Sequence, residues 1–130
     1  LKYLDQAGNY VPPDQGRQVA PIEVYRRNLA AIVTRLAATG ATPIFATTTP
    51  VPAGSAGRLA GSERPYNQCA LEIMRAHSVA VTDLWSLAVK RQSEILRPND
   101  VHFTTEGYLE LAGLVAQGVR AALPAPGARR

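Results

Sequence analysis

Three stretches of the chain repeat apolar residues at the spacing of an amphipathic helix, three or four positions apart. The first begins at Pro21, which suits the first turn of a helix, and Gly40 is a plausible C-terminal cap. The second covers residues 63–77. The third begins near Thr104, a good N-cap residue, and ends before Pro124. The expected core positions are Ile22, Tyr25, Leu29, Ile32, Val33, Leu36, Tyr66, Ala70, Ile73, Met74, Tyr108, Leu111, Ala112, Val115, Val119 and Ala122.

Two short apolar segments between these helices have the composition of buried strands. Residues 42–49 are β-branched and apolar, and residues 79–84 form the second segment. A short helix is expected at residues 86–92. The order helix, strand, helix, strand, helix is typical of a parallel sheet with helices on both faces. We therefore expect an α/β fold whose site lies beyond the carboxyl ends of the strands, in the loops after Thr49 and Leu84.

The remaining segments are rich in turn-forming residues. Residues 1–20 are predicted to be a loop or an arm, and residues 124–130 a disordered tail. Residues 50–62 combine Gly, Ala, Ser and Pro and are predicted to be a mobile loop in which Ser55 and Ser62 are linker residues. The folded unit is therefore expected at residues 21–123.

Composition limits the classes of function. The 130 residues are 46% hydrophobic and 18% charged, as in ordinary globular proteins. The net charge is +4, but the basic residues are scattered and form no stripe with aromatic residues, so nucleic acid is not an expected partner. No apolar run reaches the length of a transmembrane helix, so no membrane partner is expected.

The sequence gives weaker evidence about cofactors and about the location of the protein. No phosphate-loop motif occurs, and we expect neither a cofactor nor a metal site. The one cysteine, Cys69, is expected to be a thiol in or near the core, not a nucleophile. No signal peptide is visible. Because the chain begins at Leu1, we expect an upstream segment, so a periplasmic or secreted location stays open.

One segment carries candidate catalytic chemistry, the run from Asn99 to Thr104 before the last helix. His102 is the candidate base, because a histidine side chain can take up and return a proton. Such a base needs a neighbour that holds its other ring nitrogen. Asn99 offers a carbonyl oxygen and Asp100 a carboxylate, and the sequence leaves both open. The alternative role for Asp100 is a charge that favours the helix N-terminus.

The run Asn-Asp-Val-His-Phe-Thr-x-Glu-Gly-Tyr, which ends at Tyr108, closely resembles the last sequence block of the SGNH (GDSL-type) ester hydrolases. Further segments are similar to parts of that family, so the resemblance covers most of residues 22–122. These segments are Ile44–Pro52, which resembles many bacterial members, Tyr66-Asn67, and the strand that ends at Leu84.

The resemblance implies a three-layer α/β/α, flavodoxin-like parallel sheet and a small-molecule or carbohydrate ester substrate. Family members use a Ser nucleophile, a Gly and an Asn as oxyanion donors, and a His base. The resemblance therefore implies that His102 is the base of an acyl-transfer site.

Two departures from the family pattern limit this inference. The family's Asp, three residues before the His, aligns with Asn99, and the nearest carboxylate is Asp100. The Gly-Asp-Ser block and the Gly-x-Asn-Asp block are absent, and in the family both precede the region present here. We therefore expect this chain to be the C-terminal portion of such a domain, without its N-terminal strands and inactive alone.

Three functions stay open. The intact protein is expected to be a carbohydrate acetylesterase or short-chain acyl esterase that works by Ser–His acyl transfer. The alternative is a catalytically inactive SGNH-like module that binds carbohydrate or a protein partner. An unrelated flavodoxin-like binding domain has the least support. If the N-terminal strands are missing, an uncovered sheet edge also predicts self-association.

Overall fold

A pair of parallel strands lies at the centre of the computed structural model, which describes residues 2–123. β4 (Ile44–Ala46) pairs with β5 (Ala80–Thr82), and Phe45 lies opposite Val81. The connection between them runs through a helix, as parallel strands require. The disordered tail predicted at residues 124–130 lies outside the described residues.

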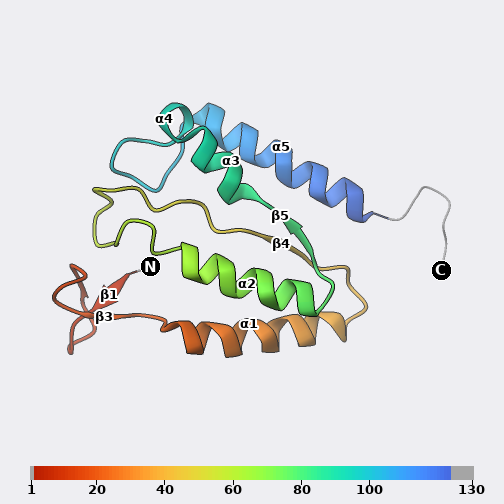
Figure 1. Ribbon diagram of the computed structural model, residues 1–130, viewed down its shortest axis with the longest axis horizontal. Coiled ribbons are helices and arrows are strands. Elements are labelled where there is room, and N and C mark those ends of the chain that lie inside the picture. The colour runs from red at the N-terminus through yellow and green to blue at the C-terminus, as the bar shows by residue number, and fades with distance from the viewer. Residues whose placement is uncertain (1, 124–130) are drawn as a thin grey trace.

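Helices cover both faces of this pair of strands (Figure 1). One layer contains α1 (Ile22–Ala37) and α2 (Arg64–Ala76), and α2 contacts β5. The other contains α3 (Leu84–Lys90), α4 (Gln92–Ile95) and α5 (Thr105–Ala122), and α5 contacts both strands. The three-layer α/β class expected from the sequence is confirmed. None of the helices within residues 2–123 has both the length and the apolar character that crossing a bilayer demands.

Residues 2–20 hold more structure than the predicted loop or arm. β1 (Tyr3–Leu4) pairs antiparallel with β2 (Tyr10–Val11) and with β3 (Arg17–Gln18) in a small second sheet. The Asp5 carboxylate accepts the backbone N–H groups of Ala7 and Asn9, which closes the turn between β1 and β2. Gly8-Asn9 therefore lies in a turn.

The helices bury two separate hydrophobic clusters. The first lies between α1 and α2 and contains Val33, Cys69, Ile73 and Met74. Cys69 is 2% exposed, so it is a core thiol. The second lies beneath α5 and contains Ala88, Ile95, Leu96, Phe103 and Leu111. Phe103 follows His102 directly, so the second cluster anchors the loop that carries the histidine.

Several residues predicted to face the core are exposed instead. Ile32, Leu36, Tyr108, Val115 and Val119 are between 39% and 53% exposed. The periodicity of α1 and α5 is helical as predicted, but the sheet within the described residues has two strands. A sheet of that width cannot cover the whole apolar stripe of either helix.

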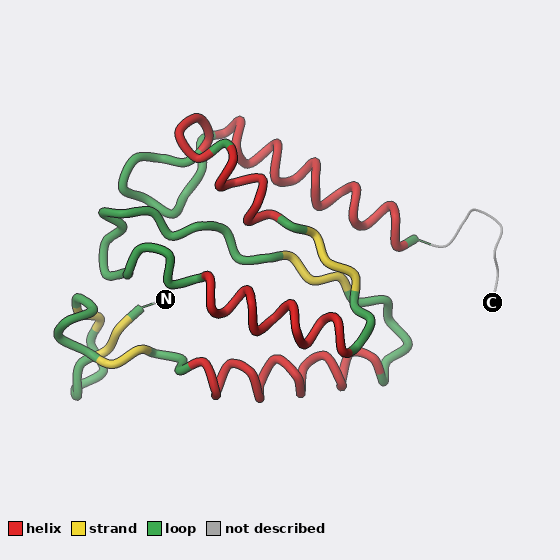
Figure 2. The backbone as a smooth tube through the Cα atoms, in the orientation of Figure 1, coloured by secondary structure: helices red, strands yellow, loops and turns green. Residues whose placement is uncertain are grey.

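The 50–62 loop has more order than the sequence predicts. Successive turns fold it, with backbone N–H groups donating from Ser55 to Pro52, from Arg58 to Ser55 and from Ser62 to Leu59. Both linker serines are buried, and neither hydroxyl has a hydrogen-bond partner among the described residues. Figure 2 shows that this loop and the one before α5 lie at the same end of the molecule, beyond the carboxyl ends of β4 and β5.

Candidate functional site

His102 lies at the end of a tight loop between α4 and α5. Leu96 and Phe103 form an antiparallel bridge at its base. The backbone N–H of Arg97 donates to the carbonyl oxygen of His102 across 2.9 Å. Because Leu96 and Phe103 are both buried, they fix the two ends of the loop to the core and leave the loop between them facing solvent.

The tip of this loop is a β-turn. The N–H of Asp100 donates to the carbonyl of Arg97, with Pro98 and Asn99 between them. Asn99 has a φ of 56°, in the left-handed region. Proline pre-sets the second position of a type II turn, and asparagine tolerates the left-handed third position. The sequence Arg-Pro-Asn-Asp therefore shapes the tip locally.

Asp100 and His102 are in direct contact. The Oδ1 atom of Asp100 lies 2.7 Å from Nδ1 of His102, and it also accepts the backbone N–H groups of Val101 and His102. A carboxylate only accepts hydrogen bonds, so Nδ1 carries the proton and Nε2 is free to accept one. The hydrogen bond from the His102 ring, helped by the two backbone N–H groups, holds the pKa of Asp100 below its ordinary value.

Asn99, the other candidate partner, makes no hydrogen bond to the imidazole among the described residues. Its side chain packs against Gly54, where an added Cβ would lie 2.6 Å from the Asn99 Oδ1 atom. The structure thus brings Asp100 to His102 and brings Asn99 to the 50–62 loop. The side chains of His102 and Asp100 are 62% and 38% exposed, so the pair is open to solvent. Their catalytic role stays a prediction.

Thr104 caps α5 as predicted. Its hydroxyl accepts the backbone N–H of Gly107 across 3.1 Å, and its own N–H donates to the carbonyl of Ile95. A Cβ on Gly107 would lie 2.7 Å from that same carbonyl oxygen. Only glycine lets the first turn of α5 approach α4 this closely, and this approach sets the position of the His102 loop.

A hydrogen-bond network that the sequence did not reveal joins the ends of β4 and β5. The hydroxyl of Thr47 donates to Asp83 and accepts the backbone N–H of Trp85. Asp83 caps α3 by accepting the N–H of Ser86. Partial burial acts to raise the pKa of Asp83, but the hydrogen bonds from Ser86 and Thr47 outweigh it and lower that pKa.

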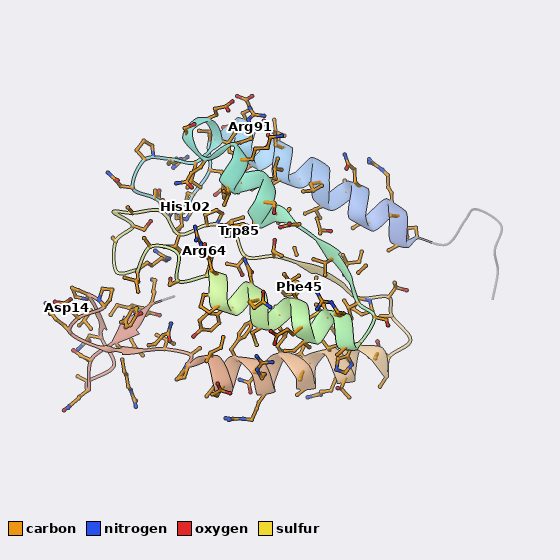
Figure 3. All side chains as sticks on the ribbon, viewed as in Figure 1. Asp14, Phe45, Arg64, Trp85, Arg91 and His102 are labelled. Carbon is orange, nitrogen blue, oxygen red and sulfur yellow. The ribbon has the colours of Figure 1, made fainter. Side chains whose placement is uncertain are left out.

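Glu63 is a buried acid that sequence reasoning missed. It is 3% exposed, and its two carboxylate oxygens accept the indole N–H of Trp85 and the backbone N–H of Val51. The guanidinium of Arg64 lies 5.6 Å from the centre of the Trp85 ring. In the view of Figure 3, Arg64, Trp85 and His102 lie near one another. A Glu at a helix start normally signals an exposed charge, so the sequence holds no signal for this role.

The described residues 2–123 offer the His102 ring one hydrogen-bond partner, Asp100, and no serine hydroxyl bonds to it. Nor does this part of the chain bring together three or more His, Cys, Asp or Glu side chains that could hold a metal ion. The site can therefore supply an oriented proton acceptor, with its Nε2 atom directed away from Asp100.

Comparisons with known proteins support the fold. No protein-family model matches the chain, and no curated protein does. One similar solved structure is a lipase/acylhydrolase from Enterococcus faecalis, 21% identical with a TM-score of 0.69, matched over 90% of this chain and 59% of that one. Another is LAE5, an alpha/beta hydrolase from the metagenome of Lake Arreo, Spain. It is 15% identical, with a TM-score of 0.66, and is matched over 86% of this chain and 52% of that one.

The chain thus spans between about half and three fifths of the length of these two solved chains. At such identities the similarity concerns the fold alone. This chain has the α/β architecture that the two hydrolases contain.

Proposed function

We propose that the intact protein is an ester hydrolase of the SGNH (GDSL) type, in which His102 is the general base and Asp100 positions it. Its substrates are carbohydrate acetyl esters or short-chain acyl esters. The observation that carries the proposal is the 2.7 Å contact between Asp100 Oδ1 and His102 Nδ1. The pair lies in the loop before the last helix of an α/β fold, at the end of the sheet where such folds bind ligands.

The proposed reaction is acyl transfer in two steps. Nε2 of His102 takes the proton of a serine hydroxyl while the serine oxygen attacks the ester carbonyl, and the leaving alcohol receives that proton. Water, deprotonated by the same nitrogen, then attacks the acyl-serine; the bond to the serine oxygen breaks, that oxygen takes the proton back from the imidazole, and the carboxylic acid leaves. Asp100 keeps the proton on Nδ1 and stabilises the imidazolium that forms. The serine and the oxyanion donors belong, in this proposal, to another part of the intact protein.

Hydrolysis of p-nitrophenyl acetate by the intact protein tests the role of His102. The substitution His102→Ala is expected to lower kcat/KM by about 10²- to 10⁴-fold, the usual contribution of a general base. His77→Ala is the matched control, because this second histidine ends α2 and is exposed. Equal rates for the His102→Ala variant and the unsubstituted protein would overturn the proposal.

Nitrogen-15 NMR of the imidazole tests the role of Asp100. The ring is expected to favour the tautomer protonated at Nδ1, and Asp100→Ala is expected to remove that preference while the fold stays intact. In the hydrolysis assay, kcat is expected to fall and KM to stay unchanged. An unchanged tautomer in the Asp100→Ala variant would show that the carboxylate does not position the ring.

A non-catalytic module that binds carbohydrate or protein is the second candidate. It is favoured by one observation, the lack of a serine hydroxyl bonded to His102 within residues 2–123. The hydrolysis assay separates the two candidates, because a binding module would show no rate that depends on His102.

We also propose that the chain associates with a second copy of itself through the sheet. Within the described residues β4 and β5 pair only with each other, so each strand presents an unpaired edge. Light scattering is expected to show dimers or larger species. A monodisperse monomer with a cooperative melt would contradict this proposal.

A further inference from the structure

A groove runs between the 50–62 loop and helices α3 and α4. It consists of two open cavities of about 490 and 460 Å³ that share Pro52, Ala53, Val89 and Gln92. We call these two cavities together the loop groove. The first cavity reaches Asn99 in the His102 loop, and the second reaches Arg64 at the start of α2. The loop groove therefore ends three residues from the proposed base.

The charges that line the loop groove are unbalanced. Arg64, Lys90 and Arg97 line it together with one acid, Glu63. Glu63 is buried, and both of its oxygens already accept N–H groups from Val51 and Trp85. Its carboxylate is therefore directed into the protein and not into the groove.

The three basic side chains of the loop groove lack an acidic partner among the described residues. Within residues 2–123, none of them lies within 4.0 Å of a carboxylate oxygen, whereas Arg26 and Arg91 form ion pairs with glutamates. Open cations beside a surface of low dielectric raise the local concentration of anions. The loop groove is consequently an electropositive surface with unused hydrogen-bond donors.

Part of the wall between these cations is apolar. Val51 and Leu96 are buried with 8% and 7% exposure, and Pro52 and Val89 form the part that the two cavities share. An apolar wall suits the carbon skeleton of a ligand, while guanidinium and ammonium groups bind carboxylate or phosphate oxygens through strong charge-assisted hydrogen bonds.

We propose that the loop groove binds an ester that carries a carboxylate or a phosphate group, with Arg64, Lys90 and Arg97 as its charge partners. This inference rests on the proposed function, because it names the substrate class of the same site. Asn99 links the loop groove to the proposed base, because it lines the groove and belongs to the turn that presents His102.

NMR titration of the amide signals tests binding without requiring turnover. The probes are monomethyl succinate, which carries a carboxylate, methyl phosphate, and the neutral dimethyl succinate, all added to the His102→Ala variant of the full chain. We expect at least one anionic probe to bind about tenfold or more tightly than dimethyl succinate, with shifts centred on Val89, Lys90 and Arg97. Added salt is expected to weaken that binding. The tighter of the two anionic probes identifies the acidic group.

A charge-matched pair of variants locates the binding surface. A triple variant of the groove is expected to abolish the preference for the anionic probe. It combines Arg64→Gln, Lys90→Gln and Arg97→Gln. The control combines Arg35→Gln, Arg75→Gln and Arg120→Gln, which remove the same charge from the last turns of α1, α2 and α5. Circular dichroism checks that both variants stay folded.

Two results would overturn the loop groove as the binding site. They are equal affinity for the charged and neutral probes, and equal loss of affinity in both triple variants. Selective binding of an anionic probe by a protein that hydrolyses no ester would overturn the proposed function alone. Hydrolysis that depends on His102 but shows no preference for charged esters would overturn the loop groove alone.

Discussion

Two carboxylates hold the two loops at the carboxyl end of the sheet, and their surroundings are opposite. Glu63 is 3% exposed and accepts N–H groups from Val51 and Trp85, 12 and 22 positions away in the sequence. The Asp100 side chain is 38% exposed and accepts from its neighbours Val101 and His102. The first acid joins distant parts of the fold, and the second organises a local turn.

This difference decides what each acid contributes. A buried N–H group that loses its acceptor stays unpaired, whereas an exposed one finds water. The free energy of unfolding should therefore depend strongly on Glu63 and weakly on Asp100. Asp100 should matter for the orientation of the imidazole, because a hydrogen bond of 2.7 Å fixes which ring nitrogen carries the proton.

The largest effect is expected for Glu63→Leu. The substitution leaves the N–H of Val51 and the indole N–H of Trp85 without an acceptor, and each loss costs roughly 1–3 kcal/mol. Urea denaturation is expected to show a free energy of unfolding about 3 kcal/mol lower. Glu94→Leu is the control, because Glu94 forms an exposed ion pair with Arg91, and exposed pairs contribute little to stability. Equal losses in the two variants would remove the distinction between the acids.

A smaller effect is expected where the two loops touch, at Gly54. Gly54→Ala forces a side chain into a left-handed backbone with a φ of 80° and brings its Cβ to 2.6 Å from Asn99. We expect a loss of about 2–3 kcal/mol. Gly57 has a similar φ of 65°, but an added Cβ would have nothing within 4 Å. Gly57→Ala should therefore lower the free energy of unfolding by only about 1 kcal/mol.

The Asn99→Gly background sharpens this test of the contact between the loops. Without the Asn99 side chain, Gly54→Ala should cost no more than Gly57→Ala, because only the backbone penalty remains. If the cost of Gly54→Ala is the same in both backgrounds, the loops are not coupled through this contact.

Loss of the α5 cap ranks next. Thr104→Ala removes the hydroxyl that accepts the N–H of Gly107, and the free energy of unfolding is expected to fall by about 1 kcal/mol. The neighbouring Thr105→Ala is the control, because Thr105 is exposed and lies within the helix. Thermal denaturation of the two variants measures the difference. An equal effect would mean that the cap does not stabilise the His102 loop.

The smallest effect is expected in how the free energy of unfolding changes at acidic pH. The pKa of Asp100 is lowered in the folded protein, so its stabilisation is present at neutral pH and is lost as the pH falls through that lowered pKa. Unfolding curves over this acidic range should show the loss, and Asp100→Asn should flatten it. A variant whose acid sensitivity equals that of the unsubstituted protein would show that the contact with His102 stabilises nothing.

The sequence by itself determined the features that depend on near neighbours. Helical periodicity located α1, α2 and α5, the Pro98-Asn99 pair shaped the turn before His102, and Thr104 capped the last helix as expected. These interactions join residues one to four positions apart, so the local order of residue types is enough to predict them.

Only the tertiary structure decided the rest. It buried Glu63 under Trp85, joined Thr47 to Asp83 across 36 positions, and gave the 50–62 loop its order. It also brought Asp100 to the imidazole while Asn99 packed against Gly54. Each of these outcomes depends on which segments pack together, and residue types along one segment carry no information about the segment that will cover them.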